Sequence, residues 1–379
     1  MNILIAPDSF KETLTAGEAA DTIAKGLRRG FPAANLSTAP MADGGEGTVD
    51  ALVEATGGKY VAAETEDPLG RKVTALYGIL GDGETAAIEM AEASGIQLVA
   101  SHERDPKTAS TYGTGELIRD ALDHGVTNMI IGIGGSATND GGAGMAEALG
   151  VRFLDANGAD IARGGAALTE LAAIDTINLD PRLRDVRFRI ACDVDNPLTG
   201  ERGASAVFGP QKGASADDIT RLDRALTRYA ELLARDVGTD PSAIPGAGAA
   251  GGLGAGMVAF LDAELESGAT IVADETNLAD AIARADLVIT GEGGINHQTV
   301  YGKTPIHVAK LAKTHNLPVI ALCGTISPGY ETVYDAGIDA VFSAVTGPIS
   351  FDELKADPIT PLETAAENLG RLLAMKISS

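Results

Sequence analysis

The chain has 379 residues, of which 45% are apolar and only 4% aromatic, and it contains no Trp. A chain of this length exceeds what one hydrophobic core usually serves, so we expect two domains. Small and aliphatic core residues are typical of parallel sheets covered by helices and disfavour an all-β sandwich. The net charge of -24 repels nucleic acid and anionic membrane surfaces, which excludes both as partners.

The cysteines, the histidines and the hydropathy exclude several kinds of site. Cys192 and Cys323 lie far apart in apolar runs, which favours buried free thiols over a disulfide or a nucleophile. The five histidines fall at no metal-ligand spacing, so no zinc site is expected. Met1 leads within two residues into a strand-like run, and no apolar run approaches the roughly 18 residues of a membrane span. The sequence therefore predicts a cytoplasmic protein without a signal peptide.

The first 66 residues alternate between strand and helix patterns. Residues 2–7 predict a strand, and a helix begins after Thr15, with Glu18 completing its capping box. Residues 36–40 predict a second strand, which a helix follows, and residues 60–63 predict a third strand.

Short loops follow the first two of these strands. They are formed by Asp8, Ser9, Phe10 and Lys11, and by Asp43, Gly44, Gly45 and Glu46. Helix capping explains Ser9 or Asp43 taken separately. The two loops together, beside Lys11, favour a binding site for a small polar acid.

The segment from residue 277 onward repeats the alternation. Strands are expected over 286–290, 319–323 and 340–345, with helices over 277–285, 305–314 and 362–375. Right-handed crossovers favour an α/β fold with a doubly wound, Rossmann-like sheet of six parallel strands in the order 3-2-1-4-5-6. Residues 1–66 and 277–379 would form this domain, and residues 67–276 an inserted second α/β domain. The ligand crevice is expected at the switch point, where Asp8–Lys11 and Gly291–Lys303 would meet.

A glycine-rich loop stands out in the inserted segment. The run from Asn128 to Gly142 passes from apolar residues into glycines and then into hydroxyl, amide and carboxyl side chains. Glycines let backbone amides approach an anion, so the pattern favours phosphate binding, with a tight capped turn as the alternative. The residues expected to contact phosphate are Gly134, Gly135, Ser136, Thr138, Asn139, Asp140 and Gly141. Ala137 replaces the third glycine of a dinucleotide fingerprint, which disfavours an NAD-dependent oxidoreductase.

Further positions carry candidate chemistry. Asp193 and Asp195 alternate at a strand end, as a general base and a Mg²⁺ ligand could, although an Asx turn is equally well supported. Lys212 lies in a loop framed by glycine and proline, and Lys303 lies in a near-match to a P-loop that lacks the first glycine. Together these groups indicate phosphoryl transfer, in which positioning and charge neutralisation supply most of the catalysis.

Seven segments resemble the bacterial glycerate kinases of type I. They are PDSFKETLTA (7–16), PMADGGEGT (40–48), GTGELI (113–118), IGIGGSATNDGGAGM (131–145), ACDVDNPLTG (191–200), VFGPQKGA (207–214) and PGAGAAGGLG (245–254). The resemblance covers essentially the whole chain. It implies ATP-dependent phosphorylation of D-glycerate, most often to 2-phosphoglycerate, with Mg²⁺ and on two α/β domains.

We therefore expect the following roles. D-Glycerate would be bound by Ser9, Phe10, Lys11 and the loop of Asp43, Gly44, Gly45 and Glu46. The ATP phosphates would lie on the glycine-rich loop, with further contacts from Lys212, Glu292, Gln298, Thr299 and Lys303. Asp193 is the first candidate for the general base, Lys11 and Asp8 are further catalytic residues, and Asp195 lies near Mg²⁺. The sequence leaves open whether the chain is a monomer or a homodimer.

One stretch departs from the family pattern G-E-G-R-I-D-x-Q-T-x-x-G-K. This chain has Gly294 and Asn296 in place of the arginine and the aspartate. If the family's arginine and aspartate bind phosphate or metal, their absence here could impair catalysis. The alternative function is then a catalytically impaired two-domain binder of small acids or nucleotides. A kinase that forms 3-phosphoglycerate is the other alternative, because the sequence does not fix the hydroxyl that is phosphorylated.

Overall fold

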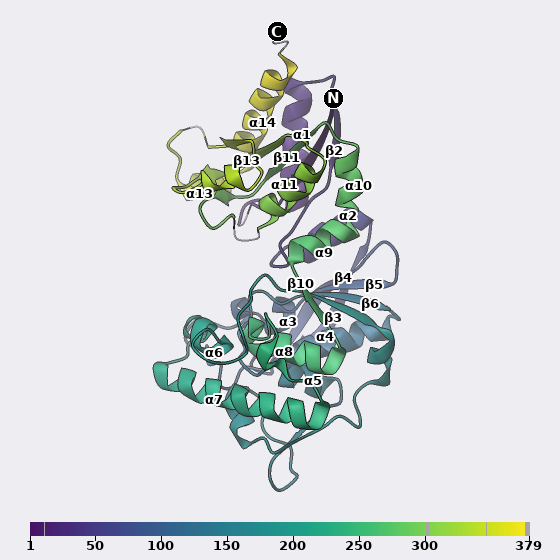
Figure 1. Ribbon diagram of the computed structural model, residues 1–379, viewed down its shortest axis with the longest axis vertical. Helices are drawn as coiled ribbons and strands as arrows, with labels where there is room; N and C mark the ends of the chain where they lie inside the picture. Colours follow the sequence, from purple (N-terminus) through teal and green to yellow (C-terminus); the bar gives the residue numbers. More distant parts are fainter. Residues whose placement is uncertain (11, 301–302, 346, 376–379) are drawn as a thin grey trace. The chain divides into compact units, whose positions relative to one another are not determined.

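The computed structural model describes residues 1–10, 12–300, 303–345 and 347–375 (Figure 1). The chain divides into two compact units. The first unit comprises Met1–Asp43, Asp50–Thr56 and Ala269–Ser379, and the second comprises Gly44–Val49 and Gly57–Gly268. Two helices, α2 (Thr48–Thr56) and α9 (Gly268–Glu275), contain residues of both units.

The first unit is built on a parallel sheet with the strand order β15-β13-β11-β1-β2. Its strands are β1 (Asn2–Pro7), β2 (Asn35–Thr38), β11 (Leu287–Gly291), β13 (Val319–Cys323) and β15 (Ala340–Ser343). Residues Ile3 to Ala6 of β1 are buried, as expected for a central strand that is covered on both faces. Because β2 and β11 flank β1 on opposite sides, the switch point of the sheet lies between β1 and β11.

Helices cover this sheet. They are α1 (Ala16–Gly30), α10 (Leu278–Ala283), α11 (Thr304–Thr314), α12 (Thr332–Asp335), α13 (Phe351–Ala356) and α14 (Ile359–Ala374), with the two-residue strands β12 (Gly294–Ile295) and β14 (Thr325–Ile326) paired beside them. The predicted capping box of Thr15 and Glu18 begins α1. Helices α1 and α14 lie side by side (Figure 1), where a Cβ atom on Gly26 would stand 2.3 Å from the carbonyl oxygen of Glu363. Glycine is therefore required at this crossing.

The second unit contains a mixed sheet with the order β10-β9-β6-β5-β4-β3. Its strands are β3 (Lys59–Glu66), β4 (Lys72–Ile79), β5 (Thr85–Glu89), β6 (Asn128–Gly132), β9 (Arg187–Ala191) and β10 (Glu264–Glu266), and β7 (Arg152–Leu154) pairs with β8 (Ala173–Asp175). Its helices are α3 (Ala91–Ser94), α4 (Tyr112–Asp123), α5 (Ala143–Ala148), α6 (Ala204–Phe208), α7 (Ala216–Leu232) and α8 (Ala249–Leu261).

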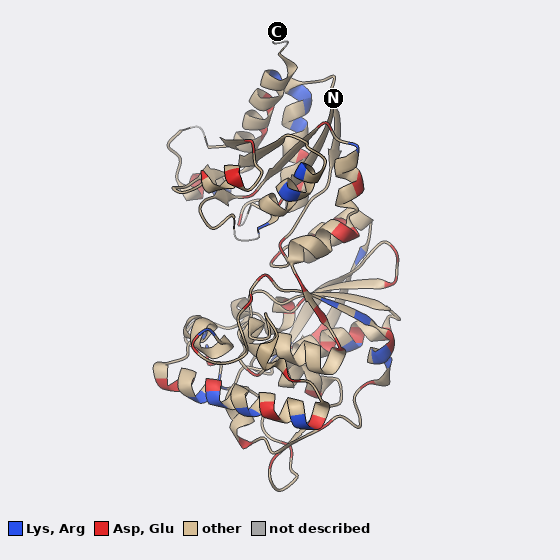
Figure 2. Cartoon of the chain, viewed as in Figure 1, with Lys and Arg blue, Asp and Glu red and all other residues tan. Residues whose placement is uncertain are grey.

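Helix α7 is amphipathic, with charged residues along its length and apolar residues in the core. Acidic and basic residues are interspersed along this helix (Figure 2), whereas Leu222, Leu226 and Tyr229 are buried. No helix in the described part of the chain is long and apolar enough to span a membrane.

The predicted α/β class with parallel strands is confirmed, but the predicted third strand is not part of the first sheet. Residues 60–63 lie in β3, which pairs antiparallel with β4 in the second unit. The segment between them is a tight turn in which the Asp67 carboxylate accepts hydrogen bonds from the amides of Leu69 and Arg71. A turn this short makes a hairpin, because a parallel neighbour needs a crossover of about a dozen residues. The order 3-2-1-4-5-6 is therefore wrong, and the unit boundary precedes β3 rather than following residue 66.

Candidate active site

Asp8 stands at the switch point of the first sheet, immediately after β1. The parallel register sets Pro7 opposite Gly291, and the amide of Asp8 donates a hydrogen bond to the carbonyl oxygen of Gly291 at 2.8 Å. The side chain is only 6% exposed. Its Oδ1 accepts from the amide of Ser9 at 2.6 Å, and its Oδ2 accepts from Oγ1 of Thr304 at 2.7 Å. Asp8 is thus held by the strand end and by the first turn of α11.

The pKa of Asp8 is raised to about 7, chiefly by burial and also by the nearby carboxylates of Asp43 and Glu292. The hydrogen bonds from Thr304 and Ser9 act in the opposite direction, because they stabilise the ionised form. A carboxyl group with a pKa near neutrality is suited to accept a proton from a substrate hydroxyl group.

Glu292 follows β11 at the same sheet edge. Its Oε1 accepts from Oγ1 of Thr299 at 2.7 Å, and its Oε2 is 2.8 Å from the ammonium group of Lys303. Asn296 shapes this segment, since its Oδ1 accepts from the amide of Gln298 at 2.7 Å. The aspartate of the family pattern would accept the same hydrogen bond, so either asparagine or aspartate at position 296 can form this turn. The side chain of Gln298 is exposed.

A cavity of about 300 Å³ opens at this point of the first unit, and we name it the switch-point cavity. It is lined by Asp8, Ser9, Phe10, Thr13, Glu292, Gly293, Gly294, Lys303, Gly324, Thr325, Ala344, Phe351, Leu354, Pro358 and Leu362. It brings together residues predicted for the substrate (Ser9 and Phe10) and for the nucleotide (Glu292 and Lys303). Lys11 lies outside the described residues.

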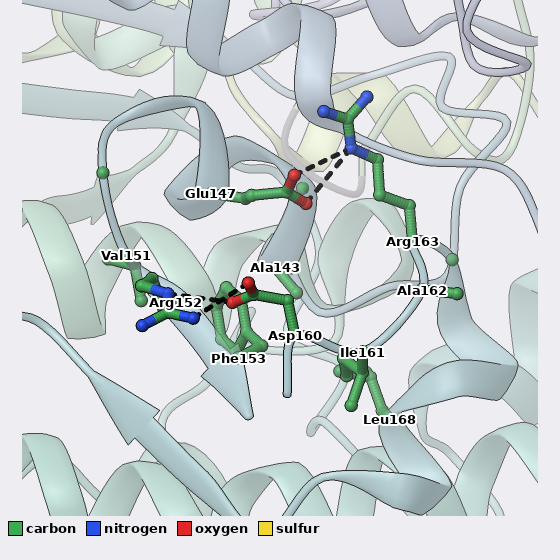
Figure 3. A pocket seen from close by; sticks show the side chains of 13 residues that line it. Ala143, Glu147, Val151, Arg152, Phe153, Asp160, Ile161, Ala162, Arg163 and Leu168 are labelled. Atoms are coloured by element: carbon green, nitrogen blue, oxygen red, sulfur yellow. Dashed lines mark hydrogen bonds and ion pairs between the residues drawn. The ribbon is translucent and has the colours of Figure 1, made fainter. Parts of the chain in front are cut away.

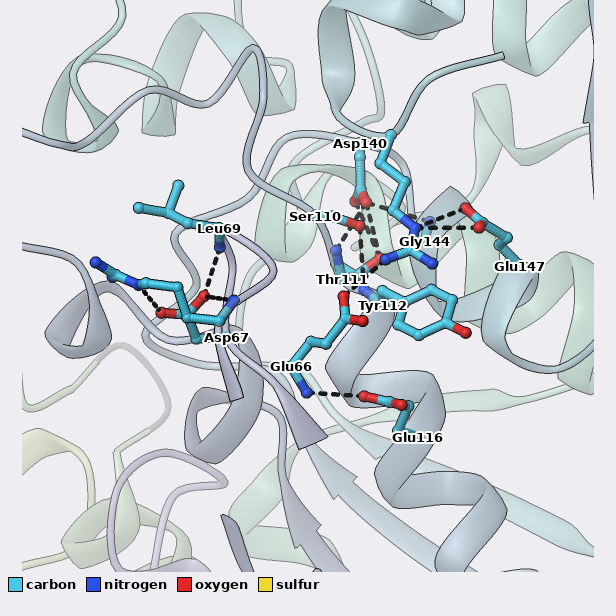
Figure 4. A network of polar contacts seen from close by, with 12 residues as sticks. Glu66, Asp67, Leu69, Ser110, Thr111, Tyr112, Glu116, Asp140, Gly144 and Glu147 are labelled. Carbon is cyan, nitrogen blue, oxygen red and sulfur yellow. Dashed lines mark hydrogen bonds and ion pairs between the residues drawn. The ribbon is translucent and has the colours of Figure 1, made fainter. Parts of the chain in front are cut away.

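The glycine-rich loop of the second unit follows β6 and is organised around Asp140. This carboxylate is fully buried and accepts hydrogen bonds from the amides of Thr111 and Gly144 at 2.8 and 3.2 Å (Figure 4). It also accepts from the amide of Gly142 at 3.2 Å. The hydroxyl of Thr111 lies 2.9 Å from Oδ2. Burial raises the pKa of Asp140, while these hydrogen bonds lower it. Asp140 therefore holds the loop in shape from inside and is not exposed to a ligand.

Lys212 is buried and forms hydrogen bonds with two residues of the same loop. It is 1% exposed, and its ammonium group donates to Oγ of Ser136 and to the carbonyl oxygen of Thr138, both at 2.7 Å. Burial lowers the pKa of Lys212 to about 7, although the charge of Asp140 raises it. Lys212 thus fixes the hydroxyl of Ser136. The predicted direct contact of Lys212 with phosphate stays a prediction, because its ammonium group is buried and bonded to the loop.

Polar atoms around this loop remain without partners among the described residues. They are Oγ1 of Thr138, Oδ1 of Asn139 and the hydroxyl of Tyr229. The amide nitrogen of Asn139 does have a partner, because it donates to Oγ of Ser205 at 3.0 Å. Tyr229 and Ser205 were missed by the sequence analysis, since neither belongs to a recognisable motif.

The loop Gly44–Glu46 belongs to the second unit, whereas Asp43 belongs to the first. A Cβ atom on Gly44, whose φ is +86°, would lie 2.5 Å from the Cβ atom of Ala191. Glycine is thus needed at position 44 for backbone conformation and for packing against β9, whereas Glu46 is exposed.

Asp193 and Asp195 are both exposed and follow the end of β9. The carboxylate of Asp193 accepts from the amide of Gly268 at 3.2 Å, and that of Asp195 pairs with Arg202 at 2.8 Å. The described residues contain no cluster of three or more His, Cys, Asp or Glu that could hold a metal ion. Both cysteines are free as predicted, but Cys192 is half-buried rather than buried.

A second cavity, of about 280 Å³, lies beside α5 in the second unit (Figure 3). Val151, Phe153 and Leu168 give it apolar walls. Its charged lining residues pair with each other, Arg152 with Asp160 at 2.9 Å and Arg163 with Glu147 at 3.0 Å. These charges are paired internally, as Glu292 and Lys303 are in the switch-point cavity, but this cavity has no counterpart of Asp8, which forms no ion pair among the described residues.

The pKa of Asp8 makes the stability of the first unit dependent on pH. The folded-state pKa is raised, so the contribution of Asp8 to stability is fully present below pH 3.8 and is lost as the pH rises to about 7. We expect Asp8→Asn to gain free energy of unfolding relative to wild type between pH 4.5 and 7.5, by up to about 4 kcal/mol. Denaturant unfolding across this range measures the gain. The exposed control Asp335→Asn should show no such trend, and a gain independent of pH would contradict the assignment.

The pKa of Lys212 predicts the reverse dependence for the second unit. Its folded-state pKa is lowered, so its contribution is fully present above pH 10.5 and is lost as the pH falls to about 7. We expect the stability of Lys212→Met relative to wild type to rise by up to about 4 kcal/mol as the pH falls from 10 to 7. Paired unfolding curves at the two pH values, with the exposed Lys72→Met as control, measure this change. Equal differences at both values would show that the buried amine does not titrate in this range.

Comparisons with known proteins agree with one another. The family model described as the glycerate kinase family matches residues 3–374. A glycerate kinase of Halalkalibacterium halodurans is 54% identical over 367 residues, which cover 97% of each chain. The glycerate 2-kinase of Escherichia coli K12 is 52% identical over 375 residues, covering 99% of this chain and 98% of that protein. A crystal structure from Salmonella typhimurium LT2, described provisionally as a glycerate kinase 2, matches with a TM-score of 0.91 at 52% identity, and the match covers 98% of both chains. The chain therefore belongs to the glycerate kinase family.

Proposed function

We propose that the protein transfers the γ-phosphoryl group of ATP to the 2-hydroxyl group of D-glycerate, giving 2-phosphoglycerate and ADP. Membership of the glycerate kinase family supports the reaction class, and the Escherichia coli relative, named glycerate 2-kinase, supports the position of the new ester. The observation in this chain that carries the proposal is Asp8, a buried carboxyl group with a pKa of about 7 beside a cavity at the switch point.

Asp8 is the general base in this proposal. Its carboxylate accepts the proton of the glycerate hydroxyl group as the oxygen attacks the γ-phosphorus, the bond from that phosphorus to the bridging oxygen breaks, and ADP leaves. The hydrogen bond from Thr304 orients Oδ2, which keeps the base in one position without a rearrangement during the reaction. Asp193 stays an alternative base.

The charges around Asp8 suit a phosphoryl transfer. Lys303 lies at the beginning of α11, where the ammonium group and the helix N-terminus both favour an anion. Glu292 holds this ammonium group in place. In the second unit, the glycine-rich loop from Gly134 to Gly141 stays a predicted phosphate site. Mg²⁺, which neutralises phosphate charge during such transfers, would be held mainly by the nucleotide, with Asp195 as the predicted protein ligand.

The reaction is tested by a phosphorus NMR time course with the full chain, MgATP and D-glycerate. We expect a 2-phosphoglycerate signal that grows with ADP and is missing without protein. A 3-phosphoglycerate signal would show that the protein phosphorylates glycerate but at the 3-hydroxyl group. No ester above the protein-free control would refute the proposal and favour a non-catalytic binder, with Gly294 and Asn296 as the sequence differences to reverse first.

The identity of the base is tested by two matched substitutions. We expect Asp8→Asn to lower kcat by about 10²- to 10⁴-fold, because an amide cannot accept the proton. In the wild type, kcat/KM should fall as the pH drops below about 7, since Asp8 becomes protonated. Asp193→Asn, at an exposed carboxylate, should change kcat by no more than a few fold. The reverse ranking of the two variants would assign the base to Asp193.

A further inference from the structure

The switch-point cavity has two ends of different character. Asp8, Glu292 and Lys303 form a charged end at the edge of the sheet. The opposite wall is apolar and comes largely from the C-terminal helices, with contributions from Phe10, Ala344, Phe351, Leu354, Pro358 and Leu362. A ligand that fills the cavity must therefore carry a charged part and an apolar part.

D-Glycerate does not meet this requirement. Each of its three carbon atoms carries an oxygen, so it has no apolar face to place against this wall. A volume of about 300 Å³ lies at the lower end of pockets that enclose larger organic ligands, and far exceeds what a three-carbon acid fills. The apolar wall thus implies a second, larger ligand beside the site where glycerate reacts.

Phe351 is the unusual member of the apolar wall. It is 54% exposed in a chain that has only eight Phe and no Trp. It begins α13, a short helix that is fixed by the capping box of Ser350 and Glu353 and by the ion pair of Lys355 with Glu12. The ammonium group of Lys355 lies 5.0 Å from the centre of the Phe351 ring. The aromatic ring is therefore presented at the cavity by a helix that is held at both ends.

The charged end suits the other part of such a ligand. The ammonium group of Lys303 precedes α11, an 11-residue helix whose N-terminus favours a phosphate group. A purine nucleoside triphosphate matches both ends of the cavity, because it has a flat base with apolar faces at one end and phosphate groups at the other.

We propose that the switch-point cavity binds the nucleoside of ATP, with the purine against Phe351 and Leu354 and the phosphates directed to Lys303 and the first turn of α11. This assignment rests on the proposed function, in which ATP is the phosphoryl donor. It places the γ-phosphoryl group at the Asp8 end of the cavity and makes α13 a determinant of nucleotide affinity.

The proposal is tested by steady-state kinetics of the full chain. We expect Phe351→Ala to raise KM for ATP about fivefold or more, because stacking of a base on an aromatic ring is lost. KM for D-glycerate should stay within about twofold, and Phe351→Trp should restore KM for ATP. The control is Phe342→Ala, an exposed phenylalanine of the same unit that does not line the cavity. A rise in KM for D-glycerate alone, or no change in either constant, would overturn the proposal.

A binding measurement separates this proposal from the proposed reaction. Saturation-transfer NMR with adenosine, which has no phosphate groups, needs no turnover. We expect transfer to the purine protons with the wild type and a clear loss with Phe351→Ala, but not with Phe342→Ala. Adenosine binding without glycerate phosphorylation would refute the kinase and keep the nucleoside site. Turnover with adenosine signals that are equal in the wild type and Phe351→Ala would keep the kinase and refute the site.

Discussion

The parallel pairing of β1 with β11 is the constraint on which the first unit depends. It brings Asp8 and Glu292, which are far apart in the sequence, to the same edge of the sheet. The apolar residues of both strands are buried, so their ends have little freedom, and the hydrogen bond from Thr304 then ties Asp8 to α11. Groups held this way need no rearrangement as charge develops in a transition state, which is how a rigid scaffold contributes to catalysis.

Each unit also carries an ionisable group whose burial costs stability. Asp8 and Lys212 are both nearly inaccessible, and neither forms an ion pair within the described part of the chain. Burial disfavours the carboxylate form of Asp8, which costs stability as the pH rises toward about 7. It also disfavours the ammonium form of Lys212, which costs stability as the pH falls toward about 7. The apolar cores offset these costs, which is typical of sites where function opposes stability.

The sequence predicted those parts of the fold and site that depend on local patterns. The strands around Asp8 and Glu292, the capping box of α1 and the glycine-rich loop all follow from hydrophobic periodicity and short motifs. The hairpin of β3 and β4 was missed, because the residue pattern of a strand does not reveal which strand it pairs with. The burial of Lys212 could not be foreseen either, since it depends on contacts with Ser136 and Thr138, more than 70 positions earlier in the chain. The exposure of Asp193, likewise, is set by tertiary packing and not by the alternation of residues around it.

The insertion of the second unit has a consequence for how the protein is made. β1 is synthesised before the second unit, whereas its neighbour β11 follows 284 residues later, as the hydrogen bond from Thr290 to Ala6 shows. All strands of the second unit are synthesised in between. The inserted unit can therefore fold during translation while β1 still lacks one edge partner, and the nascent chain must keep that apolar strand from aggregating until β11 has been synthesised.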